Sequence, residues 1–103
     1  MRPHVPIDRD RLARFCRRWK VAEFALFGSV LRDDFRPDSD VDVLVAFAPD
    51  ANWSLFDLVR MEDELSELFG RRVDLVERKA VEQSENYIRR KHILGSLQHL
   101  DVA

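Results

Sequence analysis

The chain has 103 residues, with 17 basic and 19 acidic side chains and a net charge of −2. This length suits one domain with a modest hydrophobic core, and the near-neutral charge argues against general electrostatic capture of nucleic acid. The sequence has no run approaching the roughly 20 apolar residues that cross a bilayer and no apolar signal-peptide segment, and it has one cysteine. We therefore expect a single domain over residues 1–103 in a cytoplasmic protein.

The N-terminal part predicts an amphipathic helix followed by a buried strand. Across residues 8–19 the apolar side chains recur at helical spacing, at Leu12, Phe15, Cys16 and Trp19. Because Cys16 lies on this apolar face, we expect it to pack in the core rather than to react. Residues 21–27 are apolar and aromatic, and they predict a strand that ends at Gly28.

A glycine-serine turn follows this strand. The missing side chain of Gly28 lets backbone N–H groups approach an anion, and a short helix expected from Ser29 to about Asp34 would direct its positive end at the same place. The sequence therefore predicts a phosphate-binding turn at Gly28 and Ser29.

Two carboxylates open the next strand, which we expect over residues 40–47. Alternate residues of a strand share a face, so Asp40 and Asp42 project together while Val41 and Val43 point to the opposite side. Two carboxylates at this spacing repel unless a cation lies between them, and Mg²⁺ held by carboxylates and substrate phosphates is the usual solution. This pair is the candidate metal site.

The second half of the chain predicts two further helices and a third strand. We expect a helix from Ser54 to Gly70, a strand over residues 72–77 and a last helix that begins at Ser84. The outcome is a small α/β domain, a sheet of three or more strands backed by helices on one face, with the carboxylates on the other face.

Gly28-Ser29, ten intervening residues and Asp40-x-Asp42 together resemble the signature of the DNA polymerase beta nucleotidyltransferase superfamily. The short chain is similar to the minimal nucleotidyltransferases that serve as antitoxins beside HEPN-domain toxins, and the resemblance covers about residues 21–76. It implies a polymerase beta-like α+β fold with a small mixed sheet that carries the carboxylates on its open face. Members of the superfamily place a third carboxylate on a later strand, which here corresponds to Asp74.

The resemblance also implies a metal-dependent reaction in which AMP passes from ATP to a hydroxyl group. Asp40 and Asp42 would hold two Mg²⁺ ions, and Asp74 would bind the second ion. The third carboxylate would also position or deprotonate the acceptor hydroxyl, so Asp74 is the expected residue for that role.

The nucleotide contacts implied by the resemblance begin at Gly28 and Ser29, which would hold the β- and γ-phosphates. Arg32 lies one helical turn past Ser29 and is expected either to stabilise the leaving pyrophosphate or to be an exposed charge. Val30 and Asp33 depart from the family pattern, because many relatives have a basic or polar residue and a glycine at these positions.

Three functions remain open from the sequence. The first is adenylylation of a HEPN toxin, by resemblance at a tyrosine, within a hetero-oligomer whose contact surface on this chain is expected over residues 87–97. The second is a non-catalytic antitoxin that neutralises its toxin by binding, which Val30 and Asp33 favour. The third is transfer to a small molecule or an RNA end. The net charge disfavours RNA, so we do not expect nucleic acid as a direct partner. The lack of a long apolar run argues against a membrane as a partner.

Overall fold

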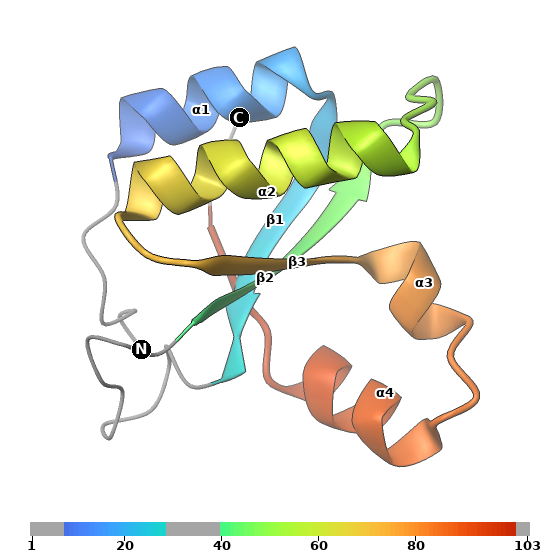
Figure 1. The fold of residues 1–103 in the computed structure, drawn as a ribbon. Helices are drawn as coiled ribbons and strands as arrows, with labels where there is room; N and C mark the ends of the chain where they lie inside the picture. The colour runs from blue at the N-terminus through green and yellow to red at the C-terminus, as the bar shows by residue number, and fades with distance from the viewer. Residues whose placement is uncertain (1–7, 29–39, 101–103) are drawn as a thin grey trace.

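A four-stranded mixed sheet lies at the centre of the computed structural model, which describes residues 8–28 and 40–100 (Figure 1). The strands run in the order β3-β2-β1-β4 and comprise β1 (Val21–Phe27), β2 (Val41–Phe47), β3 (Val73–Glu77) and β4 (Gln98–His99). β1 is antiparallel to β2 and β4, whereas β2 and β3 are parallel. The mixed α/β architecture expected from the sequence is confirmed.

Two helices, α1 (Arg9–Arg18) and α2 (Leu55–Phe69), lie across one face of the sheet (Figure 1). α2 forms the crossover that the parallel pair β2 and β3 requires. It begins with a reciprocal capping box between Ser54 and Asp57 and ends at Gly70, whose φ is +68°. These local signals explain why the boundaries of α2 agree with the sequence prediction.

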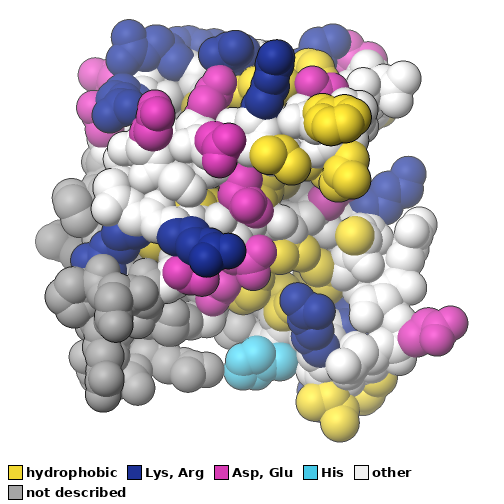
Figure 2. Space-filling view, viewed as in Figure 1, with side chains coloured by type: hydrophobic (Ala, Val, Ile, Leu, Met, Phe, Trp, Pro, Cys, Tyr) yellow, Lys and Arg dark blue, Asp and Glu magenta, His cyan; other side chains and the backbone are white. Residues whose placement is uncertain are grey.

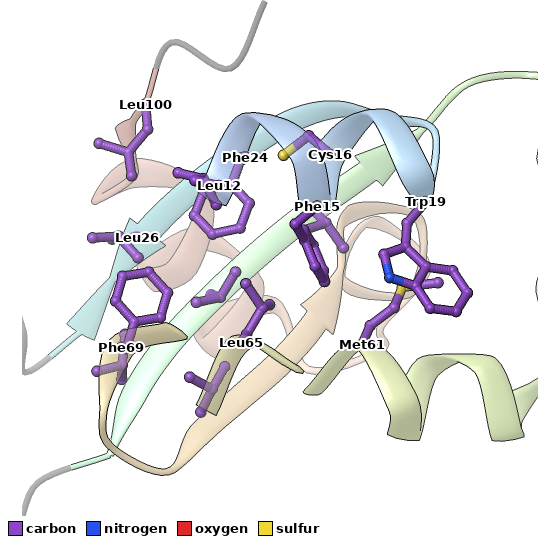
Figure 3. Close-up of a cluster of buried hydrophobic side chains, with 14 residues drawn as sticks. Leu12, Phe15, Cys16, Trp19, Phe24, Leu26, Met61, Leu65, Phe69 and Leu100 are labelled. Atoms are coloured by element: carbon purple, nitrogen blue, oxygen red, sulfur yellow. The ribbon is translucent and has the colours of Figure 1, made fainter. Parts of the chain in front are cut away.

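The main core fills the space between these helices and the sheet (Figure 3). Its buried side chains are Leu12, Phe15, Cys16, Trp19, Phe24, Leu26, Val41, Val43, Val45, Met61, Leu65, Phe69, Val73 and Leu100. Burial raises the pKa of the Cys16 thiol to about 12, which keeps it protonated at neutral pH. The expectation that Cys16 packs in the core is therefore confirmed.

The opposite face of the sheet is partly covered by α3 (Arg78–Glu82) and α4 (Tyr87–Gly95), as Figure 1 shows. A second core on this side contains Phe27, Leu44, Val81 and Ile93. The prediction that helices cover only one face was wrong, because apolar side chains of β1 and β2 also need cover on the second face.

Helix α4 begins at Tyr87 rather than at Ser84, because the side chain of Asn86 caps it by accepting the Arg89 N–H. The apolar surface expected over residues 87–97 is smaller than predicted. Ile93 is buried, and the large apolar side chains that stay exposed on α4 are Tyr87 and Ile88.

Opposite charges meet along the outer surface of α1 and α2 (Figure 2). The Arg18 guanidinium lies 2.9 Å from the Glu64 carboxylate, and the Trp19 indole N–H donates to the same carboxylate at 3.0 Å. Part of the basic N-terminal cluster is thus a paired helix face. Among residues 8–28 and 40–100, none of the helices combines the length and apolar character needed to cross a membrane.

Candidate functional site

Gly28 directly follows β1, in a conformation that places its backbone against a carboxylate of β2. Its φ is +75°, which residues with a Cβ seldom adopt. A Cβ at Gly28 would also overlap Oδ2 of Asp42. Conformation and space therefore both require glycine here. The structure thus places Gly28, the described residue of the predicted phosphate turn, against Asp42, one of the predicted metal ligands.

Asp42 and Asp74 are paired residues of neighbouring parallel strands. The β2–β3 ladder aligns Asp42 with Asp74, one residue after Val41 aligns with Val73. Adjacent strands lie about 4.8 Å apart, and paired side chains leave the same face of the sheet. Asp42 is half-buried and Asp74 is exposed, so this carboxylate pair can be reached from solvent.

Asp40 is exposed and lies immediately before β2. The Val41 N–H donates to the carbonyl oxygen of Arg72 at 2.9 Å, so strand pairing starts directly after Asp40. The three predicted carboxylates thus lie at the same end of the sheet, where β2 and β3 begin and β1 ends.

The donor set at this end suits magnesium, because carboxylate oxygens are hard ligands and Mg²⁺ usually keeps waters and substrate phosphates among its ligands. Within the two described ranges, no group of three His, Cys, Asp or Glu side chains converges closely enough to hold a metal ion by itself. The assignment of Asp40, Asp42 and Asp74 as metal ligands stays a prediction, and phosphate oxygens would have to complete any such site.

Ser29 and Arg32, together with the short helix expected over residues 29–34, lie outside the described residues. Their roles in holding the triphosphate and stabilising the leaving group therefore stay predictions. Gly28 is the described part of that turn.

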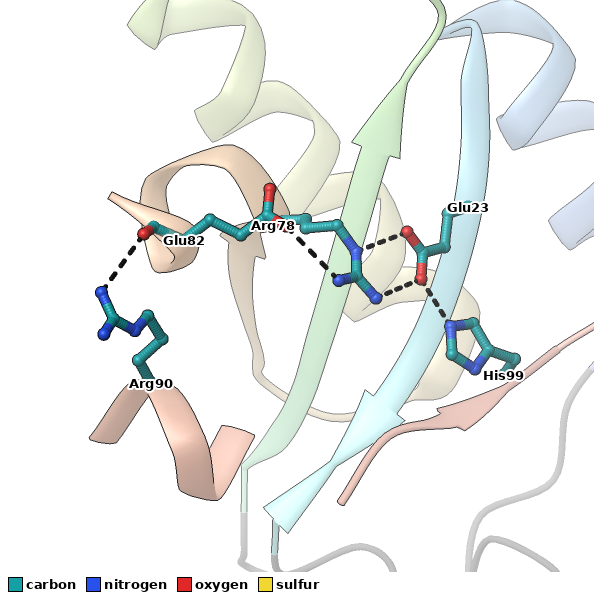
Figure 4. Close-up of polar contacts among 5 residues, drawn as sticks. All are labelled: Glu23, Arg78, Glu82, Arg90 and His99. Atoms are coloured by element: carbon teal, nitrogen blue, oxygen red, sulfur yellow. Dashed lines mark hydrogen bonds and ion pairs between the residues drawn. The ribbon is translucent and has the colours of Figure 1, made fainter. Parts of the chain in front are cut away.

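A second polar cluster on the same face was missed by the sequence reasoning (Figure 4). Glu23 of β1 accepts hydrogen bonds from Nε and Nη2 of Arg78, both 2.6 Å long, and its carboxylate also contacts the ring of His99 on β4. The hydrogen bonds from Arg78 lower the pKa of Glu23, and those to Glu23 raise the pKa of Arg78.

This cluster is distant from the aspartates. Glu23 lies four residues before Phe27, which is about 13 Å along an extended strand. It ties α3 and β4 to β1 rather than contributing to the carboxylate site. The available signal was a single charged residue within an apolar strand, because a half-buried carboxylate needs a partner.

Comparison with known proteins agrees with this arrangement. The family described as "Nucleotidyltransferase domain" matches residues 9–94. Protein adenylyltransferase MntA of Thermococcus cleftensis is 44% identical over 59 residues, which are 57% of this chain and 58% of that protein. The matched segments span 58% to 63% of the lengths of the first curated relatives, so these matches cover less than two thirds of each relative.

Two solved structures are similar over most of the chain. A protein described as a minimal nucleotidyltransferase has 33% sequence identity and a TM-score of 0.67, and the match covers 89% of this chain and 88% of that one. A toxin-antitoxin structure with AMP-PNP has a TM-score of 0.70 at 18% identity, covering 94% of this chain and 75% of that one. The second likeness is evidence of a shared fold.

Proposed function

This chain belongs to the nucleotidyltransferase domain family, and from that premise we propose that it transfers AMP from ATP to a hydroxyl group of a partner protein. The observation that carries the proposal is the contact between Gly28 and Asp42, in a strand whose Asp42 is in register with Asp74. Gly28, from which a phosphate-binding turn would start, lies beside a carboxylate that would bind Mg²⁺, and nucleotidyl transfer needs both groups.

Backbone N–H groups at Gly28 and Ser29, with the Ser29 hydroxyl, would hold the β- and γ-phosphates. This would direct the α-phosphate toward Asp42, which lies against Gly28. Arg32 would offset the negative charge that grows on the leaving group.

Asp40 and Asp42 would hold two Mg²⁺ ions, with Asp74 a ligand of the second. When bound, these ions neutralise phosphate charge and lower the pKa of the acceptor hydroxyl. Asp74 is exposed on a strand at the edge of the sheet, where an acceptor from another protein can approach it.

The proposed reaction forms one bond and breaks another at the α-phosphorus. The acceptor oxygen bonds to this phosphorus while its bond to the oxygen that bridges to the β-phosphate breaks, and pyrophosphate leaves in line. Asp74 would receive the proton of the acceptor hydroxyl. ATP and a protein hydroxyl thus become an AMP ester, pyrophosphate and a proton.

We further propose that the acceptor is a tyrosine of a HEPN-domain toxin, and that this chain is the antitoxin of a cytoplasmic hetero-oligomer. A relative named as a protein adenylyltransferase supports a protein acceptor, and a fold shared with a toxin-antitoxin structure supports a toxin as the partner. The HEPN class and the tyrosine rest on the family resemblance. Modification of the toxin would silence it.

The test is transfer of label from ATP labelled at the α-phosphate, with Mg²⁺, to the product of the neighbouring gene, taken as the candidate toxin. We expect the wild-type chain to label the toxin. Asp42→Asn should lower the rate at least about a hundredfold, because several kcal/mol of charge stabilisation are lost. Asp63→Asn is the matched control, since Asp63 is an exposed acid of α2.

Removal of Mg²⁺ with a chelator should lower the labelling rate of the wild-type chain at least as much as Asp42→Asn does. Equal labelling by Asp42→Asn and wild type would contradict the proposed site. A stable complex without any labelling would contradict catalysis and favour the alternative of an antitoxin that acts by binding alone.

A further inference from the structure

Among the described strands, none pairs with the outer edge of β3, the strand that carries Asp74. The order β3-β2-β1-β4 puts β3 at one end. Because the Val41 N–H donates to Arg72, the even-numbered residues of β3 direct their backbone groups toward β2. Val73 and Leu75 consequently direct their N–H groups outward. Unpaired N–H groups at an edge would allow the strand to shift its register or to pair with a strand of another protein.

Side chains of α2 accept both of these outward N–H groups. The Val73 N–H donates to Oγ of Ser66 at 3.0 Å, and the Leu75 N–H donates to Oε2 of Glu62 at 3.0 Å. Glu62 and Ser66 are one helical turn apart, about 6 Å along the axis. Two residues of a strand span about 6.6 Å, so the spacing of the acceptors matches that of the donors. The two bonds flank Asp74 in the chain.

Ser66 is itself held in place by several bonds. Its hydroxyl donates to the carbonyl oxygen of Glu62 at 2.8 Å, which leaves its lone pairs for Val73. Its own carbonyl oxygen accepts the N–H of Gly70 and, at 3.1 Å, the N–H of Arg71. Ser66 therefore accepts hydrogen bonds from three residues between the end of α2 and the start of β3, namely Gly70, Arg71 and Val73.

We propose that Glu62 and Ser66 are positioning residues that hold β3 in the register that sets Asp74 beside Asp42. A slip of one residue would turn Asp74 toward the main core, and a slip of two would move it about 6.6 Å along the strand. The inference rests on the proposed function for its catalytic consequence. It predicts a slower transfer step with unchanged ATP binding, because the predicted phosphate turn follows β1 and not β3.

The variants that test this are Ser66→Ala and Glu62→Ala. Glu62→Gln retains an acceptor oxygen and serves as the conservative rescue, and Glu67→Ala removes an exposed acid of the same helix as the control. Hydrogen exchange of the Val73 and Leu75 amides is measured by NMR. The kcat and the KM for ATP are measured in transfer of AMP to the toxin.

We expect Ser66→Ala to increase exchange at Val73, and Glu62→Ala at Leu75, by about tenfold each, as loss of one hydrogen bond implies. We expect kcat to fall roughly ten- to a hundredfold in both alanine variants, because small displacements of a catalytic group slow transfer strongly. The KM for ATP should not change. Glu62→Gln and Glu67→Ala should behave like the wild type in both measurements.

Unchanged exchange at Val73 and Leu75 in the alanine variants would overturn the inference, as would a wild-type kcat. If Ser66→Ala does not fold, hydrogen exchange of the Leu75 amide in Glu62→Ala and Glu62→Gln tests the inference. Faster exchange in Glu62→Ala alone supports it, and equal exchange in the two variants overturns it. If the wild-type chain transfers no AMP, the proposed function fails. The exchange measurement then still decides whether α2 holds the register of β3, with increased exchange supporting it and equal exchange overturning it.

Discussion

Gly28 and Gly70 have similar backbone conformations but different surroundings. Their φ angles are +75° and +68°. A Cβ at Gly70 would meet no atom within 4 Å, whereas a Cβ at Gly28 would overlap the Asp42 carboxylate. The two glycines therefore separate the cost of the conformation from the cost of displacing a proposed catalytic group.

We expect Gly28→Ala to abolish AMP transfer and Gly70→Ala to leave kcat within about twofold, since a Cβ at Gly70 would displace no neighbouring atom and only backbone strain results. Each variant should lose about 1–2 kcal/mol of unfolding free energy from the left-handed conformation alone. Urea unfolding and the labelling assay measure the two effects. Retained transfer by Gly28→Ala would show that Asp42 can move without loss of function.

At the level of secondary-structure elements, Glu23 connects three parts of the chain that are far apart in sequence. Its carboxylate lies in β1, its bidentate partner Arg78 begins α3, and His99 belongs to β4 (Figure 4). The side chains of Glu23 and Arg78 are 24% and 27% exposed, so water screens this pair less than it screens a surface pair. The cluster ties α3 and β4 to β1.

Through Glu23, the free energy of unfolding should decrease at acidic pH. Because Arg78 lowers the pKa of Glu23 in the folded chain, this contribution is present above the ordinary value of 4.5 and is lost as pH falls through the lowered folded value. We expect Glu23→Gln to lose about 1–3 kcal/mol of unfolding free energy at pH 7 and the difference from wild type to shrink as the pH falls below the ordinary value of 4.5.

Urea unfolding at a series of pH values measures this dependence. The control is Asp50→Asn, because Asp50 pairs with Lys20 on the surface and its loss should not measurably change stability. A difference between Glu23→Gln and wild type that stays constant down to pH 3 would contradict the assigned ion pair.

On the scale of the whole molecule, one sheet separates two hydrophobic cores of different size. The larger lies under α1 and α2, and the smaller lies under α3 and α4. The carboxylate site lies at the end of the sheet where β1 ends and β2 begins, and both cores include side chains from these two strands. Packing on both faces thus supports the strands that carry Asp42 and Gly28.

Stability should depend on the larger core far more than on the exposed side of the same helix. Leu65 of α2 is fully buried, whereas Leu55 is 76% exposed. We expect Leu65→Ala to lose about 2–5 kcal/mol of unfolding free energy and Leu55→Ala to change it by less than about 0.5 kcal/mol. Calorimetry and urea unfolding measure both values, and similar losses in the two variants would contradict the assigned core.

The sequence by itself determined those features that depend on neighbouring residues. Helical spacing of apolar side chains located α1, and the Ser54 cap and Gly70 located the ends of α2, because helix periodicity and capping act within one or two turns. The alternation of side chains along a strand likewise predicted that Asp42 lies on the face of the sheet opposite to Val41 and Val43. The resemblance to polymerase beta-like proteins predicted Asp74 as the third carboxylate, and this role stays a prediction.

Only the tertiary structure decided which distant groups meet. It placed Asp74 in register with Asp42, brought Gly28 against the same carboxylate, and covered part of the second face with α3 and α4. It also revealed the acceptors of α2 on the edge of β3 and the partners of Glu23. These contacts join residues that local spacing does not relate, since strand order and register follow from packing and hydrogen bonding across the folded chain.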